Sequence, residues 1–237
     1  MSTISKPVAF IIGYGSNLGP AIARKFRSEG FNVAVSARTL DEKAAKEDGY
    51  LSIQADFGDI ASVRNAFDRL ESELGPAAAV VYNAYSSNNT SPSDPLANSY
   101  ETFLNNVNVT GVNVYEVARR TKAGFEKLPA ETPRAFIGTG NLTPWVHFHT
   151  LLGLSVGKRA MANIVEASAR AYGPQGYRFY FAHEVKGSTG GPQPQPTGQA
   201  HADVFYRIWQ QKEQGPWEVC FTETGALYDR AAGKVVA

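Results

Sequence analysis

The feature that most constrains the fold is a glycine-rich segment, residues 13–19, that joins a compact apolar run to an amphipathic one. The apolar run, Pro7–Ile12, has the length and composition of a strand buried on both faces. The run Pro20–Ser28 repeats its apolar residues at helical spacing. Glycine allows a sharp turn and a close approach of the backbone, and the free N–H groups of a helix start attract an anion. The segment therefore predicts a strand–turn–helix unit whose turn can hold a phosphate group.

The alternation of apolar strands and amphipathic helices continues along the chain. Further strands are predicted at Phe31–Ser36, Leu51–Gln54, Ala78–Tyr82, Arg134–Gly138, Tyr177–Phe181 and Glu218–Thr222, and helices near Leu40–Glu47, Ile60–Leu74, Tyr100–Ala123, Leu152–Tyr172 and His201–Gln214. Such alternation with short connections requires right-handed crossovers between parallel strands. We therefore expect an α/β fold, a single Rossmann-type doubly wound parallel sheet of about seven strands with helices on both faces.

The length of 237 residues suits one sizeable core, and no long Pro/Ser linker divides the chain. We expect a single dinucleotide-binding domain over residues 1–237. The segment 184–200 is rich in Pro and Gly, which predicts a loop that covers the substrate.

Composition argues against several classes of partner. The 23 Lys and Arg residues balance 22 Asp and Glu residues, so no basic surface for nucleic acid is expected. With Cys220 as the only cysteine, an internal disulfide and a multi-cysteine metal site are excluded, and no metal is predicted. The apolar run at the N-terminus is too short for a signal peptide or a membrane span. We expect a soluble, cytoplasmic protein with a small-molecule substrate and no membrane partner.

The spacing of Gly13, Asn17 and Gly19 resembles that of the short-chain dehydrogenase/reductase family, and the resemblance extends over nearly the whole chain. It implies that Asp56 bonds the adenine ring, that Asn83-Ala84 belongs to the motif after the fourth strand, and that Thr189 meets the nicotinamide carboxamide. The resemblance thus implies a nicotinamide dinucleotide as cofactor. The expected cofactor-binding residues are Gly13, Gly15, Ser16, Asn17, Leu18, Gly19, Arg38, Asp56, Phe57, Asn83, Ala84, Lys158 and Thr189.

The end of the second strand indicates which dinucleotide is preferred. An acidic residue there would bond a free ribose 2′-hydroxyl and repel a phosphate, but the sequence has Arg38 and no carboxylate before Asp41. A guanidinium pairs with a phosphate in a bidentate manner. We therefore prefer NADP(H). If Arg38 is an ordinary solvated residue, NAD(H) remains possible.

The family's proton-transfer residues are absent. The resemblance places the catalytic lysine at Lys158 and the active-site asparagine at Asn108, but the tyrosine position is Leu154 and the serine position is Asn141. A leucine transfers no proton, whereas Asn141 can still donate a hydrogen bond. The candidate catalytic residues are Lys158, Asn108, Asn141, His147 and His149, of which Lys158 or either histidine is a candidate proton donor.

Several functions remain open at this point. The first is NADPH-dependent reduction of an apolar or aromatic carbonyl, enone or imine, because the segments expected at the carboxyl ends of the strands carry aromatic side chains and few charges. The alternatives are isomerase, lyase or cyclase chemistry beside a bound cofactor, and a non-catalytic sensor. A Ser155–Lys158 hydrolase pair is a further alternative. By family analogy, we expect a homodimer or homotetramer formed through the two long helices.

Overall fold

A computed structural model describes residues 6–236 of the chain. Seven parallel strands form one sheet in the order β3-β2-β1-β4-β5-β6-β7. The strands are β1 (Val8–Ile12), β2 (Asn32–Ala37), β3 (Leu51–Gln54), β4 (Ala79–Tyr82), β5 (Ala135–Thr139), β6 (Arg178–Val185) and β7 (Glu218–Thr222). The strand order reverses direction between β1 and β4, and ligands of doubly wound sheets bind at such a switch point.

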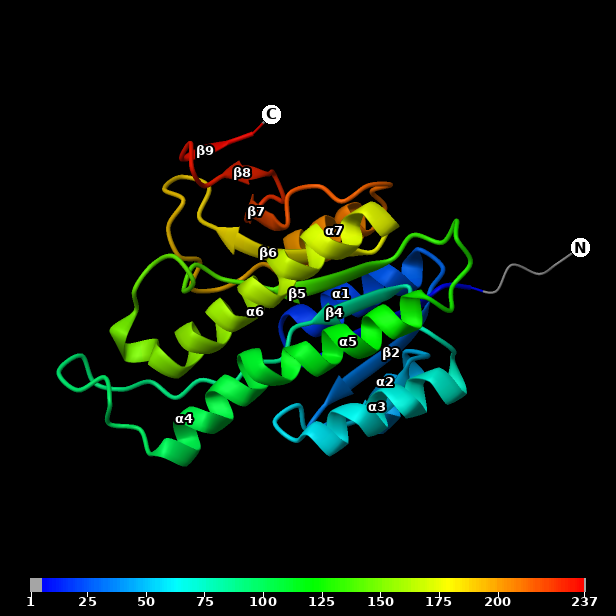
Figure 1. The fold of residues 1–237 in the computed structure, drawn as a ribbon, viewed down its shortest axis with the longest axis horizontal. Coiled ribbons are helices and arrows are strands. Elements are labelled where there is room, and N and C mark those ends of the chain that lie inside the picture. Colours follow the sequence, from blue (N-terminus) through cyan, green and yellow to red (C-terminus); the bar gives the residue numbers. More distant parts are fainter. Residues whose placement is uncertain (1–5, 237) are drawn as a thin grey trace, which may run out of the picture.

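Helices cover both faces of the sheet (Figure 1). One face carries α1 (Leu18–Ser28), α2 (Glu42–Glu47) and α7 (Gly198–Trp209), which pack against alternate β1 residues such as Ala9 and Ile11. The other face carries α3 (Ile60–Glu73), α5 (Asn113–Phe125) and α6 (Leu152–Tyr172). These helices share a core with the intervening β1 residues, such as Phe10. The predicted seven-stranded doubly wound sheet is confirmed.

The helix predicted over Tyr100–Ala123 is continuous but not regular. It consists of α4 (Tyr100–Val107), a π-helical turn η1 (Asn108–Val112) and α5. The wider turn changes which carbonyls are bonded within the helix. The hydroxyl of Tyr82, at the end of β4, donates a 2.5 Å hydrogen bond to the Val109 carbonyl. This bond ties η1 to the sheet beside the switch point.

The structure also differs from the predicted boundaries near the C-terminus. Strand β6 continues four residues beyond the predicted end at Phe181 because its polar residues His183 and Glu184 are buried like the apolar ones. Helix α7 begins at Gly198, three residues earlier than predicted. A short antiparallel pair, β8 (Tyr228–Asp229) and β9 (Lys234–Val235), was not predicted. Within residues 6–236, no helix is long and apolar enough to cross a membrane.

Candidate active site

The glycine-rich loop is fixed by its contacts with β2 and β4. Gly13 adopts φ = +81°, and a side chain there would collide with the Ala84 backbone. The Asn83 side chain donates from Nδ2 to the Gly13 carbonyl over 2.9 Å. By contrast, an added Cβ at Gly15 meets no atom within 4 Å. Gly13 therefore makes the turn possible, while Gly15 faces open space.

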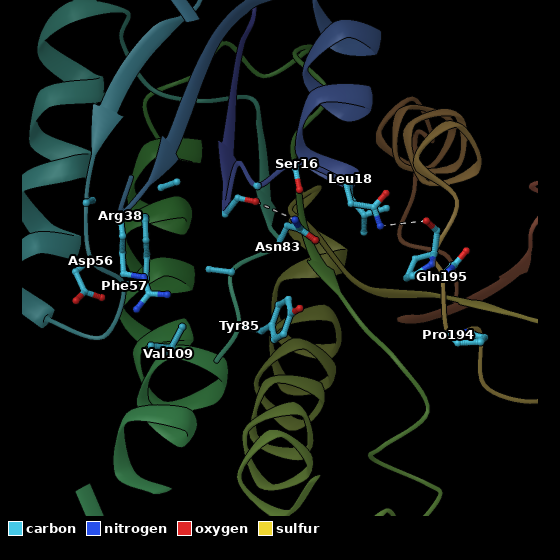
Figure 2. Close-up of a pocket in the computed structure, with 17 residues that line it drawn as sticks. Ser16, Leu18, Arg38, Asp56, Phe57, Asn83, Tyr85, Val109, Pro194 and Gln195 are labelled. Atoms are coloured by element: carbon cyan, nitrogen blue, oxygen red, sulfur yellow. Dashed lines mark hydrogen bonds between the residues drawn. The ribbon is translucent and has the colours of Figure 1, made fainter. Parts of the chain in front are cut away.

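This loop forms one wall of a cleft of about 830 Å³ at the carboxyl ends of the strands (Figure 2). The predicted cofactor-binding residues that line it are Gly13, Gly15, Ser16, Asn17, Leu18, Arg38, Asp56, Phe57, Asn83 and Ala84. Ala37, Ala55, Tyr85, Val109 and the segment 194–196 complete the lining. The cleft thus gathers residues from four successive strand ends, in the place expected for a dinucleotide.

One end of the cleft carries the exposed cationic side chain of Arg38. Arg38 is exposed, and its guanidinium forms no hydrogen bond or ion pair with any residue in the part of the chain that the structure describes. Its backbone carbonyl accepts a 2.9 Å bond from the Gln54 side chain, which anchors the main chain. Asp56 accepts a bond from the Gly58 N–H at 2.8 Å. The Arg38 side chain is therefore available to an anionic ligand without breaking a contact of the fold.

Three predicted cofactor residues do not line this cleft. Gly19 lies against the Tyr14 backbone, where a Cβ would approach within 2.9 Å, so it allows α1 to start close to the loop. The Thr189 hydroxyl accepts a 3.2 Å bond from the Gly191 N–H within its own loop. Lys158 is buried in α6. For Thr189 and Lys158, a contact with the cofactor stays a prediction.

Lys158 lies beneath the strand ends rather than in the cleft. Its Nζ donates a 2.6 Å hydrogen bond to the Thr139 carbonyl at the end of β5. Burial lowers the pKa of this amine to about 7, because a charged ammonium is costly away from water. Leu154, one helical turn earlier, is also buried. The position to which the family resemblance assigns a tyrosine is thus a buried apolar side chain.

Asn108 begins the π-helical turn η1, which packs tightly against α6. A Cβ at Gly111 would come within 2.7 Å of the Gly157 carbonyl, so only glycine permits this approach. The Asn108 side chain is half-buried and lines none of the cavities described here. Its place at the reaction centre stays a prediction.

A second, smaller cavity of about 200 Å³ adjoins the cleft at the ends of β5 and β6, since both are lined by Leu18 and Pro196. Asn141 lines it, as do Thr139 and Phe148. The Asn141 Oδ1 accepts bonds from the Thr143 N–H (3.0 Å) and hydroxyl (2.6 Å). The Nδ2 atom of Asn141 is therefore free to donate to a ligand.

The same cavity contains a buried carboxylate and imidazole that were not predicted from the sequence. Glu184, at the end of β6, accepts bonds from the Thr197 N–H (2.6 Å), the Thr197 hydroxyl (2.9 Å) and the Gln193 side chain (3.2 Å). The Nδ1 atom of His201 lies 3.3 Å from its Oε2. Burial acts to raise the pKa of Glu184, but these hydrogen bonds outweigh it and hold the pKa below its usual range.

The two histidines predicted as proton donors lie elsewhere. His147 and His149 are exposed, and neither lines the cleft or the adjoining cavity. Trp145, an aromatic residue of the same loop, stacks on His183 and lies under the Arg230 guanidinium. The structure therefore does not bring His147 or His149 together with Asn141, and their role stays a prediction without support from the cavity geometry.

Comparisons with known proteins agree with this fold and identify the family. The sequence model of the family described as short chain dehydrogenase matches residues 7–123. The short chain dehydrogenase/reductase dmxR12 of Cryptosporiopsis sp. (strain 8999) is 30% identical over 233 residues, 93% of each chain. The NADP-dependent (R)-specific alcohol dehydrogenase of Lentilactobacillus kefiri is 36% identical over 111 residues, 44% of each chain.

Solved structures show the same fold at lower identity. A metagenomic short-chain oxidoreductase in complex with NADP has a TM-score of 0.77 at 17% identity, over 93% of this chain and 99% of that chain. A short-chain type dehydrogenase/reductase from Mycobacterium marinum has a TM-score of 0.76 at 17% identity, over 93% and 95%. The fold together with the family model and the curated relatives identifies the chain as an oxidoreductase of the α/β class. The chain belongs to the short-chain dehydrogenase/reductase family.

Proposed function

We propose that this protein reduces an apolar or aromatic carbonyl, enone or imine with NADPH. The observation that carries the proposal is the unpaired Arg38 guanidinium at one end of a cleft whose other end opens beside a mostly apolar cavity. A guanidinium without a protein partner is suited to a ribose 2′-phosphate. The NADP complex of a structural neighbour and the NADP dependence of a curated relative support this preference.

The residues of the cleft fit such a cofactor. The turn at Gly13 and the open space at Gly15 leave room for a pyrophosphate against the start of α1, and Asp56 stands where an adenine would be met. When bound, NADPH supplies a hydride. The chain itself contributes orientation: the Asn141 amide donates to the substrate oxygen, and apolar side chains such as Phe148 and Leu142 exclude water from the cavity.

The test is turnover against panels of aromatic ketones, enones and cyclic imines, followed by the loss of NADPH absorbance. We expect at least one panel to be reduced, with NADPH preferred to NADH. Tight NADPH binding without turnover of any panel would refute the proposal. NADPH binding is measured first, so that an absence of turnover is not caused by a failure to bind the cofactor.

A second candidate function is non-redox chemistry, or binding alone, beside a bound dinucleotide. It is favoured by Leu154 at the tyrosine position and by the Lys158 amine, which is bonded to the Thr139 carbonyl rather than directed into the cleft. A protein of this kind would bind NADPH but leave its absorbance unchanged in the presence of any oxidised substrate. Conversion of a substrate without a change in NADPH would identify an isomerase, lyase or cyclase.

We further propose that the chain is one domain, cytoplasmic, and a homodimer or homotetramer. The assembly would form through α4, α5 and α6, where Leu104, Val112, Tyr115 and Val156 expose apolar surface. Light scattering after size exclusion should give a multiple of 25.7 kDa. A Tyr115→Glu substitution, which places a charge in that surface, should shift the mass to the monomer; an unchanged mass would place the interface elsewhere.

A further inference from the structure

We propose that His201, held in place by Glu184, is the proton donor of this site in the absence of the family's tyrosine. The inference rests on the proposed reduction, because each hydride added to a carbonyl, enone or imine must be matched by one proton. It assigns a catalytic role to α7, which carries none of the residues predicted from the sequence.

His201 and Glu184 line the cavity that Asn141 also lines. Glu184 comes from the end of β6, His201 from the first turn of α7, and Asn141 from the loop after β5. The cavity shares Leu18 and Pro196 with the cofactor cleft. An oxygen bound by the Asn141 amide would therefore lie in the same small cavity as the imidazole.

Contacts of the ring determine which nitrogen faces a ligand. The Nδ1 atom lies 2.9 Å from the Thr197 carbonyl and 3.3 Å from the Glu184 carboxylate. A carbonyl and a carboxylate only accept hydrogen bonds, so Nδ1 carries the proton. Within residues 6–236, Nε2 has no hydrogen-bond partner, and it is not among the completely enclosed polar atoms that lack one. Nε2 is therefore the nitrogen left for a ligand.

The carboxylate is well suited to orient this ring. It is almost fully buried and already bonded by Thr197 and Gln193, so its position is fixed by β6, the loop and α7 together. The ring is also clamped by edge-on contacts with Phe205 and Phe221. An imidazolium formed at Nε2 would be stabilised by the negative carboxylate on its far side. Glu184 is thus a positioning residue, and His201 is the group that meets the substrate.

The proton-transfer step balances with the reductant of the proposed function. A hydride from the reduced nicotinamide adds to the carbonyl carbon, and the π electrons of the C=O bond move to oxygen. The Nε2–H bond of the His201 imidazolium breaks as an O–H bond forms. The neutral ring keeps its Nδ1 proton towards Glu184 and regains the Nε2 proton from water. The products are an alcohol and the oxidised cofactor.

The proposal predicts a characteristic pH dependence. The rate should fall as pH rises, because a general acid must carry its proton to donate it. The titratable group in contact with the ring is Glu184. His183, which is paired with Glu218 and stacks on Trp145, interacts with His201 only through its charge. Glu223 acts on Glu184 from the loop after β7. The phenyl rings that contact His201 from β7 and α7 do not titrate.

The kinetic test compares two identical substitutions at buried histidine–carboxylate pairs. His201→Gln should lower kcat by about 100-fold or more, the usual contribution of a general acid, and should abolish the fall in rate with pH. The matched control is His183→Gln, which breaks a buried pair with Glu218 but lines neither cavity. It should keep the wild-type kcat and pH profile. Circular dichroism and NADPH affinity establish that both variants fold.

A second readout does not depend on turnover. In the full chain labelled with 15N-histidine, the neutral His201 ring should show a protonated Nδ1 and an unprotonated Nε2 that gains a proton as pH falls. Glu184→Gln should loosen the ring and broaden or displace its 15N resonances, because the ring loses the carboxylate that lies 3.3 Å from Nδ1. A neutral ring protonated at Nε2 would overturn the assignment whether or not a substrate is known.

The kinetic outcomes separate the two claims. Absence of turnover by the wild-type protein overturns the proposed reduction itself. Turnover that persists in His201→Gln with an unchanged pH profile overturns only the proton-donor assignment. Loss of the rate in His147→Gln or His149→Gln instead would also overturn it, in favour of the donors predicted from the sequence.

Discussion

Replacement of Arg38 by alanine isolates the contact that the cofactor preference depends on. The guanidinium is exposed and forms no contact with another described residue through its nitrogens, so the fold should keep its free energy of unfolding. What is lost is a charge-assisted, bidentate interaction with a 2′-phosphate, worth about 1.5–3 kcal/mol. Because 1.4 kcal/mol is a factor of ten, NADPH should bind roughly 10- to 150-fold more weakly.

The assay is calorimetric titration of both cofactors at low and moderate ionic strength. NADH lacks the phosphate, so its Kd should not change, and the loss for NADPH should shrink as salt screens the exposed charge. Arg24→Ala is the matched control, because Arg24 is an exposed arginine on α1 that does not line the cleft. An unchanged ratio of the two affinities in Arg38→Ala, or an equal loss for both cofactors, would refute the reasoning.

Three further substitutions test the geometry of the site. Gly13→Ala should lower the free energy of unfolding in urea by about 2–4 kcal/mol, because the backbone is left-handed there and the new Cβ would collide with Ala84. Gly15→Ala should leave this free energy unchanged but weaken NADPH binding. Equal stabilities of the two variants would contradict this. Tyr82→Phe removes the hydroxyl that is bonded to the Val109 carbonyl and should cost about 1–3 kcal/mol in the same assay; an unchanged stability would mean that the π turn does not depend on this bond. Burial lowers the pKa of Lys158 to about 7 in the folded chain. Between about pH 7 and 10 the unfolded chain therefore binds more protons than the folded chain. The free energy of unfolding should rise over this range by roughly 3–5 kcal/mol. Lys158→Met should abolish that rise, and a rise that persists would show that the amine is not buried.

Much of the fold could be predicted from the sequence because its determinants are local. Strands such as β1 are short apolar runs followed by a turn, and Gly13 provides the positive φ that this turn needs. The π turn at Asn108–Val112 was not predicted, since its residues continue the helical pattern without a break. It depends on a bond from Tyr82, which lies 27 residues away in the sequence.

The acid–base part of the site was harder to predict for the same physical reason. Glu184 and His201 are separated by 17 positions, and their contact requires the loop between them to fold back so that α7 starts beside the end of β6. One signal was available: a carboxylate at the end of an otherwise apolar strand must find partners when it is buried. The burial of Lys158 depends on the close approach of η1 to α6 at Gly157, which no periodicity shows.

The central claim is that this chain transfers a hydride from a dinucleotide bound in the cleft. Its most direct test uses NADPH that carries deuterium at the nicotinamide C4 position, with a substrate from the panels and mass analysis of the product. We expect one deuterium on the former carbonyl or imine carbon, or on the β-carbon of an enone. At equal cofactor concentration, Arg38→Ala should form less of this labelled product. A product free of deuterium, formed while NADPH is bound and unconsumed, would contradict it.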